Sequence, residues 1–163
     1  MKDHPITRRR ALTTLGALGL AGAGGLTLQA PRRAHAQTLG QHETVDEALK
    51  RIFGARPMKD GGGIVKLDLP LIAENGAVVP VSVDVTSPMT PANHVKTIYV
   101  VADKNRIPVV FRTTLGPEAG QAAVGATIRL GETGDVRAIV EQSDGTLLAV
   151  KREVKVTVGG CGG

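Results

Sequence analysis

Residues 79–86 read VPVSVDVT, and valine occupies every second position from Val79 to Val85. Successive side chains of a β-strand point to opposite faces of a sheet, so this period of two predicts a half-buried strand. Pro80 lies inside the pattern and has no N–H to donate to a neighbouring strand. The stretch therefore predicts a strand that lies at a sheet edge or bulges near Pro80.

Further strand signals surround this stretch at short spacing. All 19 valines lie within residues 37–163, and the whole chain has only two Phe, one Tyr and no Trp. A core of Val, Ile and Leu favours strands, because β-branched side chains pack well on a pleated sheet. The predicted strands are Ile64–Leu69, Ala77–Thr86, Val95–Ala102, Val109–Leu115, Ala123–Leu130, Val136–Gln142 and Thr146–Val158. These short strands favour a mainly β fold, an antiparallel β-sandwich.

Turn residues separate the predicted strands. Asn75-Gly76 and Asp144-Gly145 are pairs that favour type I′ hairpin turns, in which both central residues need positive φ. Two prolines stiffen a loop over residues 87–93, and Gly61–Gly63 indicates a linker or a wide turn.

One short helix is expected before the strands. Thr44 and Glu47 have the spacing of a capping box, and Gly54 is the expected stop. One face then carries Val45, Ala48, Leu49 and Ile52. A helix this short needs a docking partner, which is either its own domain or another protein.

The first 36 residues have the layout of a bacterial export signal. They carry six of the 20 basic and one of the 15 acidic residues, which accounts for the entire formal charge of +5. Arg8 and Arg9 precede an apolar stretch at residues 11–30, and Ala34-His35-Ala36 supplies an A-x-A cleavage site. The paired arginines resemble the twin-arginine type, which predicts a mature periplasmic chain starting at Gln37.

The alternative for this segment is a membrane anchor, since the apolar stretch has the minimum length for a spanning helix. Five glycines dilute it, and Arg32 and Arg33 follow it on the far side. We therefore expect no stable membrane span after cleavage. Residues 37–163 carry 14 basic and 14 acidic side chains, so no excess charge favours nucleic acid.

The expected organisation is a signal peptide at 1–36, a helix and linker at 37–63, a β-sandwich at 64–158 and a flexible arm at 159–163. The body offers little for catalysis. His42 and His94 are far apart and match no metal-binding spacing. No serine lies in G-x-S-x-G, and Ser143-Asp144-Gly145 suits a turn. We expect no catalytic residues, no metal and no bound cofactor. The alternative is that the protein is an enzyme in its own right, a free-standing hydrolase or metalloenzyme.

The carboxyl terminus is the most informative stretch. Gly159, Gly160, Gly162 and Gly163 surround Cys161, the only cysteine of the chain. Glycine has no side chain to pack and loses much freedom on ordering, so these five residues predict a mobile, exposed arm. Its neighbours supply neither a cation nor a base that would activate the thiol. A thiol at this position suits an attachment site that enters the active sites of other enzymes.

Three interpretations of Cys161 compete. It is a stray thiol on a free end, a residue that cross-links a partner in a secreted binding module, or a covalent carrier arm. The glycines on both sides favour the carrier arm, because neither of the other two interpretations requires them.

The terminal Gly159-Gly160-Cys161-Gly162-Gly163 resembles the SoxY family, the sulfur carriers of the bacterial Sox thiosulfate-oxidising system. The resemblance runs from about Glu43 to Gly163, and the twin-arginine signal fits it too. Other segments that carry it are Leu67-Asp68-Leu69-Pro70, Ile72-Ala73-Glu74-Asn75-Gly76, Ser87-Pro88-Met89-Thr90, His94-Val95-Lys96 and Ser143-Asp144-Gly145.

The resemblance implies an immunoglobulin-like sandwich that forms a heterodimer with a SoxZ-like β protein. It implies a non-catalytic carrier whose Cys161 holds the substrate covalently. A haem enzyme would couple thiosulfate to the thiol, a hydrolase would release sulfate, and a sulfane dehydrogenase, where present, would oxidise the remaining sulfur. Because the body is neutral, we expect partners to meet an apolar face or edge, with the 88–94 loop and the 44–53 helix as candidates.

Overall fold

A computed structural model describes residues 42–160 of this chain. The predicted export segment with Arg8 and Arg9 lies outside the described residues, as do Cys161, Gly162 and Gly163. Among the described residues, no helix is long and apolar enough to cross a membrane.

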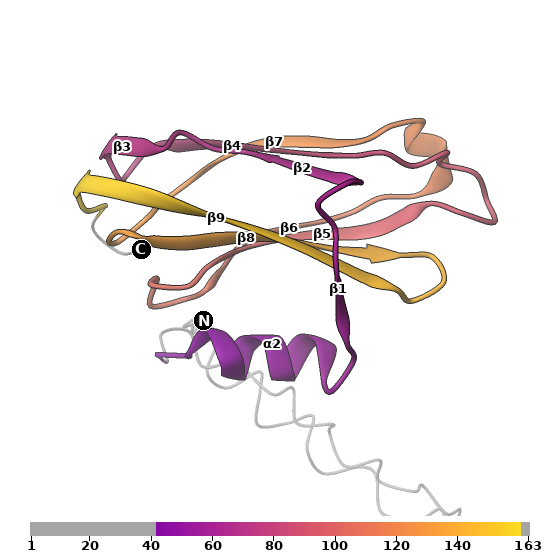
Figure 1. The fold of residues 1–163 in the computed structure, drawn as a ribbon, viewed down its shortest axis with the longest axis horizontal. Helices are drawn as coiled ribbons and strands as arrows, with labels where there is room; N and C mark the ends of the chain where they lie inside the picture. The colour runs from indigo at the N-terminus through magenta and orange to yellow at the C-terminus, as the bar shows by residue number, and fades with distance from the viewer. Residues whose placement is uncertain (1–41, 161–163) are drawn as a thin grey trace, which may run out of the picture. The chain divides into compact units, whose positions relative to one another are not determined.

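The described chain forms two β-sheets and one α-helix (Figure 1). The elements are α2 Val45–Phe53, β1 Met58–Asp60, β2 Val65–Asp68, β3 Ile72–Asn75, β4 Val79–Val85, β5 Val95–Ala102, β6 Val109–Thr114, a 3₁₀ turn at Pro117–Ala119, β7 Ala122–Ile128, β8 Gly134–Gln142 and β9 Leu147–Val158. One sheet has the order β1-β9-β8-β5-β6, with β3 also paired to β9, and the other has the order β2-β4-β7. All seven predicted strands are present in this mainly β sandwich.

Two short strands, β1 and β3, were not predicted. Both pair with β9 in parallel, whereas all other pairs are antiparallel. β1 also brings part of the expected linker into the large sheet, since Met58 lies opposite Leu147. Neither strand alternates apolar with polar residues, whereas the four-residue β2 does, so no period of two marks β1 or β3 in the sequence.

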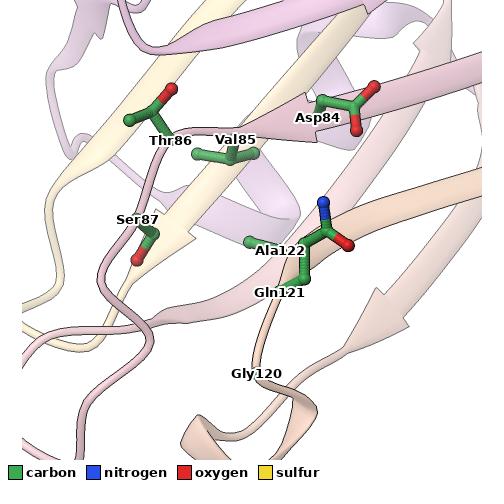
Figure 2. Close-up of a pocket in the computed structure, with 7 residues that line it drawn as sticks. All are labelled: Asp84, Val85, Thr86, Ser87, Gly120, Gln121 and Ala122. Carbon is green, nitrogen blue, oxygen red and sulfur yellow. The ribbon is translucent and has the colours of Figure 1, made fainter.

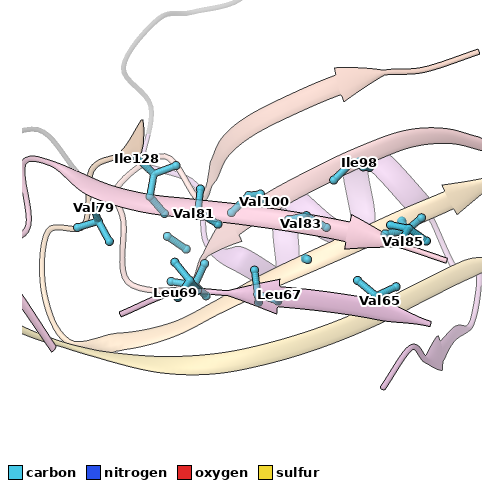
Figure 3. Close-up of a cluster of buried hydrophobic side chains, with 14 of the residues drawn as sticks. Val65, Leu67, Leu69, Val79, Val81, Val83, Val85, Ile98, Val100 and Ile128 are labelled. Carbon is cyan, nitrogen blue, oxygen red and sulfur yellow. The ribbon is translucent and has the colours of Figure 1, made fainter. Parts of the chain in front are cut away.

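β4 confirms the valine pattern. Val79, Val81, Val83 and Val85 are all buried and point into the core between the sheets (Figure 3). The β2 register ends with Asp68 opposite Ser82, so Pro80 has a partner only on the β7 side, where it pairs with Thr127. The proline therefore lies at a local edge of a central strand, as its missing N–H requires.

The helix α2 covers the other face of the large sheet. Thr44 and Glu47 form the predicted capping box, and Gly54 ends the helix with a φ of 64°. Ala48 and Phe53 are buried, and a second apolar cluster joins Phe53 to β5, β8 and β9 through Tyr99, Val101, Ile139 and Leu147. The helix thus docks on its own domain, so its apolar face is not the partner surface considered above.

Two expected turns differ from the type I′ form. Asp144 and Gly145 do connect β8 to β9, but among the described residues of this turn only Gly145 has positive φ, at 84°. Asn75 and Gly76 join β3 to β4, which belong to different sheets, and Gly76 does not have positive φ. That pair therefore makes a corner between sheets and no hairpin.

Candidate functional site at the carboxyl terminus

The last described residues are held by backbone hydrogen bonds. The Gly76 N–H donates to the Val158 carbonyl over 2.7 Å, and the Leu130 N–H donates to the Gly76 carbonyl over 2.7 Å. The Gly160 N–H then donates to the Leu130 carbonyl over 2.9 Å. We call Gly76, Leu130 and Gly160, with Val158, the glycine clasp. It fastens the residue immediately before Cys161 to the ends of β3 and β7.

The clasp depends on residues without a side chain. A Cβ at Gly76 would lie 2.2 Å from the Leu130 carbonyl oxygen and 2.8 Å from the Gly160 nitrogen. A Cβ at Gly160 would lie 2.7 Å from Gly76 backbone atoms, and one at Gly159 would lie 2.3 Å from the Gly131 oxygen. Real Cβ contacts are never this short, so the close backbone approach requires glycine.

Asn105 braces the clasp from the turn between β5 and β6. Its side chain is only 7 % exposed. The Nδ2 group donates to the Arg129 carbonyl over 2.7 Å, and Oδ1 accepts from the Gly131 N–H over 2.9 Å. These two bonds hold the backbone on both sides of Leu130. Because Asn is common in turns, its presence at position 105 did not predict this role.

These contacts differ from the expectation of an arm that is free from Gly159 onward. Gly160 is buried and hydrogen-bonded, and Gly159 packs against the Gly131 carbonyl. The folded body thus continues through Gly160, because glycine allows backbones to approach each other as readily as it allows motion. Cys161, Gly162 and Gly163 lie outside the described residues.

Exposed apolar side chains gather near the clasp. Leu71, Ile72, Val78 and Val158 are 60–68 % exposed. Leu71 and Ile72 lie at the start of β3, whose Asn75 is opposite Val158, and Val78 follows Gly76 by two residues. We call these four side chains the apolar rim. Single exposed apolar residues are common, but four along β3 and the clasp that follows it form a candidate contact surface.

The other sequence candidates have structural roles. His94 Nδ1 lies 3.1 Å from the Thr90 carbonyl, and the His94 N–H donates to the Ser143 hydroxyl over 3.2 Å. Met89 of the 88–94 loop is buried, so this loop points its apolar side chain into the core. Within residues 42–160, no group of three or more His, Cys, Asp or Glu side chains could hold a metal ion.

Shifted pKa values belong to structural ion pairs and caps. A hydrogen bond from the Thr44 backbone lowers the pKa of Glu47, and one from the Thr146 backbone lowers the pKa of Asp144. The hydrogen bond with Asp103 raises the pKa of Arg137. Each shift has a partner that stabilises the fold, and none marks a general acid or base.

A shallow hollow of about 300 Å³ lies at the far end of β4 from the clasp. Figure 2 shows its lining, which consists of Asp84, Val85, Thr86, Ser87, Gly120, Gln121 and Ala122. These residues supply no nucleophile beside a base, and the hollow is remote from the carboxyl terminus. The clasp and the apolar rim therefore remain the better candidate site.

The fold and the site together define an immunoglobulin-like β-sandwich whose carboxyl end leads into a glycine-flanked cysteine. The sequence model of the family described as sulfur oxidation protein SoxY matches residues 49–161, which include Cys161. This chain belongs to the SoxY family.

Solved structures agree with this assignment. The sulfur carrier protein SoxY from Chlorobium limicola f thiosulfatophilum is similar to this chain with a TM-score of 0.59 and 30% identity, over 71% of this chain and 97% of that one. A superoxide reductase (neelaredoxin) from Ignicoccus hospitalis, variant E23A, shares the fold with a TM-score of 0.52 and 20% identity, over 57% and 79% of the two chains. At 20% identity, this similarity is evidence for a shared fold alone. No match was found among curated protein sequences.

Proposed function

We propose that this protein carries sulfur covalently on Cys161 and presents it to partner enzymes during thiosulfate oxidation in the periplasm. The observation that carries the proposal is the family match, which extends to the chain's only cysteine. The glycine clasp supports it, because it places the residue before Cys161 at a defined point on the folded body.

In the proposed reaction sequence, the Cys161 sulfur is modified in successive steps. A haem enzyme takes two electrons and one proton as the Cys161 sulfur bonds to the outer sulfur of thiosulfate, which gives a cysteine S-thiosulfonate. On a hydrolase, water then attacks the sulfone sulfur, which releases sulfate and two protons and leaves a persulfide anion. A sulfane dehydrogenase, where present, takes six electrons from the outer sulfur while three waters supply three oxygen atoms and release six protons, which gives a cysteine S-sulfonate. The hydrolase then adds water again, which releases sulfate and one proton and restores the thiol. The carrier supplies only the thiol and its position.

The body of the protein fits a carrier better than a hydrolase. Among the described residues, the shifted pKa values have structural partners, and no cluster could hold a metal. Chemistry at Cys161 then has to come from the active sites that the arm visits.

Partners would meet the end of the sandwich that carries the arm. The apolar rim lies there, and α2 covers the part of the outer face of the large sheet that Tyr99, Val101, Ile139 and Leu147 form. A SoxZ-like β protein as heterodimer and the enzymes that act on Cys161 are the proposed partners. Because the mature body has no net charge, these contacts would depend little on salt.

Intact mass of the mature protein, after incubation with thiosulfate and the haem enzyme, tests the proposal. The wild type should gain a reductant-labile thiosulfate adduct, and Cys161→Ser should gain none. A relocated thiol in Cys161→Ser/Ser87→Cys is the matched control, because Ser87 lies at the far end of β4. Equal loading of the relocated thiol, or adducts that persist in Cys161→Ser, would exclude a specific carrier arm. A reducible dimer as the only active form would favour the cross-linking module.

A further inference from the structure

The glycine clasp fixes the point from which the thiol starts. We propose that Gly76 and Asn105 are positioning residues for Cys161: they hold Gly160 on the body and thereby limit where the carried sulfur can lie. This inference rests on the proposed function of Cys161 as the carrier thiol. It assigns a role to two residues that lie 85 and 56 positions before the cysteine in the chain.

The clasp shortens the reach of the arm. In a chain free after Val158, Cys161 would be three residues, at roughly 3.4 Å each about 10 Å, beyond the sheet. With Gly160 bonded to Leu130, the Cys161 Cα lies about 3.8 Å from a fixed Cα. An enzyme that reaches the thiol must then approach the end of the sandwich closely, where the apolar rim lies.

Gly76 is the centre of the clasp. Its N–H binds the Val158 carbonyl, its carbonyl accepts from Leu130, and its missing Cβ leaves room for the Gly160 nitrogen. Any side chain at position 76 would push Leu130 and Gly160 apart. A single added methyl group should therefore release the arm without changing either sheet.

Asn105 fixes the other side of the clasp. It is one of the few buried polar side chains, and both of its hydrogen bonds go to the backbone that flanks Leu130. The Leu130 carbonyl can accept the hydrogen bond from Gly160 only if the Leu130 backbone keeps its orientation. Fixing Gly160 also reduces the conformational entropy that the arm loses when it enters an active site, which favours binding.

The single cysteine allows a direct test. A methanethiosulfonate nitroxide attached to Cys161 reports the mobility of the arm in its electron paramagnetic resonance spectrum. Gly76→Ala should narrow the lines compared with wild type, because the arm gains free length. Gly125→Ala is the matched control, since a Cβ at this β7 glycine meets nothing within 4 Å. Identical spectra for Gly76→Ala and Gly125→Ala, with both proteins folded, would overturn the inference.

Hydrogen exchange tests the clasp without any substitution. In the wild type, the Gly160 amide should exchange about tenfold more slowly than in an unstructured glycine peptide, as one backbone hydrogen bond requires. Exchange at the peptide rate would refute the clasp. Asn105→Ala should bring the Gly160 amide back toward that rate, and unchanged protection would remove Asn105 from the role.

Reactivity separates positioning from folding. The rate at which a small reagent alkylates Cys161 should stay within about twofold in Gly76→Ala, because the substitution adds no charge or base that would change the thiol's reactivity. Loading by the haem enzyme should show a raised KM in the same variant, and an unchanged KM would contradict the inference. If the wild type is not loaded at all, the proposed function fails, while the spectra and exchange rates still decide whether the clasp exists.

Discussion

The ring of Phe53 in α2 meets the ring of Tyr99 in β5 edge to face, with centroids 5.0 Å apart and planes at 77°. This contact joins the helix to the outer face of the large sheet. Arg56 lies over the Phe53 ring and Arg112 over the Tyr99 ring, so charged side chains cover the pair from outside. The helix and these two arginines thereby cover the part of the sheet face around Tyr99.

Phe53→Ala should lower the free energy of unfolding by about 3–5 kcal/mol, because it removes a buried aromatic side chain and leaves a cavity. Phe53 is 3 % exposed. Chemical denaturation measures the change. Leu71→Ala is the control, because Leu71 is 68 % exposed and its loss should change stability by no more than about 0.5 kcal/mol. Equal effects of the two substitutions would show that α2 does not dock on the sheet.

Asn105→Ala should cost about 1–3 kcal/mol, since it leaves the Arg129 carbonyl and the Gly131 N–H without their partner. Asn93→Ala, at an exposed loop position, should change stability little. Thermal unfolding followed by circular dichroism compares them. A stability loss no larger than that of Asn93→Ala would mean that the brace contributes nothing.

Acid should weaken the helix cap and the β8–β9 turn. The Thr44 N–H holds the pKa of Glu47 below its ordinary 4.5, and the Thr146 N–H holds that of Asp144 below 3.8. Both carboxylates bind fewer protons in the folded state, so their stabilisation is present above these ordinary values and is lost as pH falls through the lowered ones. Melting temperatures between about pH 5 and pH 3 should fall less steeply in Glu47→Gln than in wild type. The exposed Glu74→Gln is the control, and parallel curves for Glu47→Gln and wild type would contradict the assignment.

Val78→Asp should weaken binding of a partner enzyme or of a SoxZ-like protein by about tenfold or more, because it places a charge within the apolar rim. Ile64→Asp serves as the control, because Ile64 is 41 % exposed and lies away from the clasp. Its carbonyl accepts a hydrogen bond from the Thr86 N–H, just beyond the other end of β4. Calorimetry at two salt concentrations measures affinity. Equal affinities for the two variants would place the contact surface elsewhere.

Local patterns predicted most of the fold. The seven predicted strands follow from the period of two and from β-branched residues, and α2 follows from the capping box of Thr44 and Glu47. The hairpin at Asp144-Gly145 was placed correctly, although its turn has only one residue with positive φ. Asn75-Gly76 misled the turn prediction, because the Gly76 backbone is occupied by Val158 and Leu130, which lie far away in sequence.

Seven strands, the helix, the neutral body and the single cysteine follow from local sequence, because period, caps and composition are properties of neighbouring residues. The parallel pairing of β1 and β3 with β9 and the packing of α2 on the large sheet appear only in the folded chain. The folded chain alone also shows that Gly160 is fastened to Leu130, with Asn105 behind it. Those contacts join backbone groups far apart in the chain. A backbone hydrogen bond leaves no mark in the side-chain sequence beyond the glycine that makes room for it.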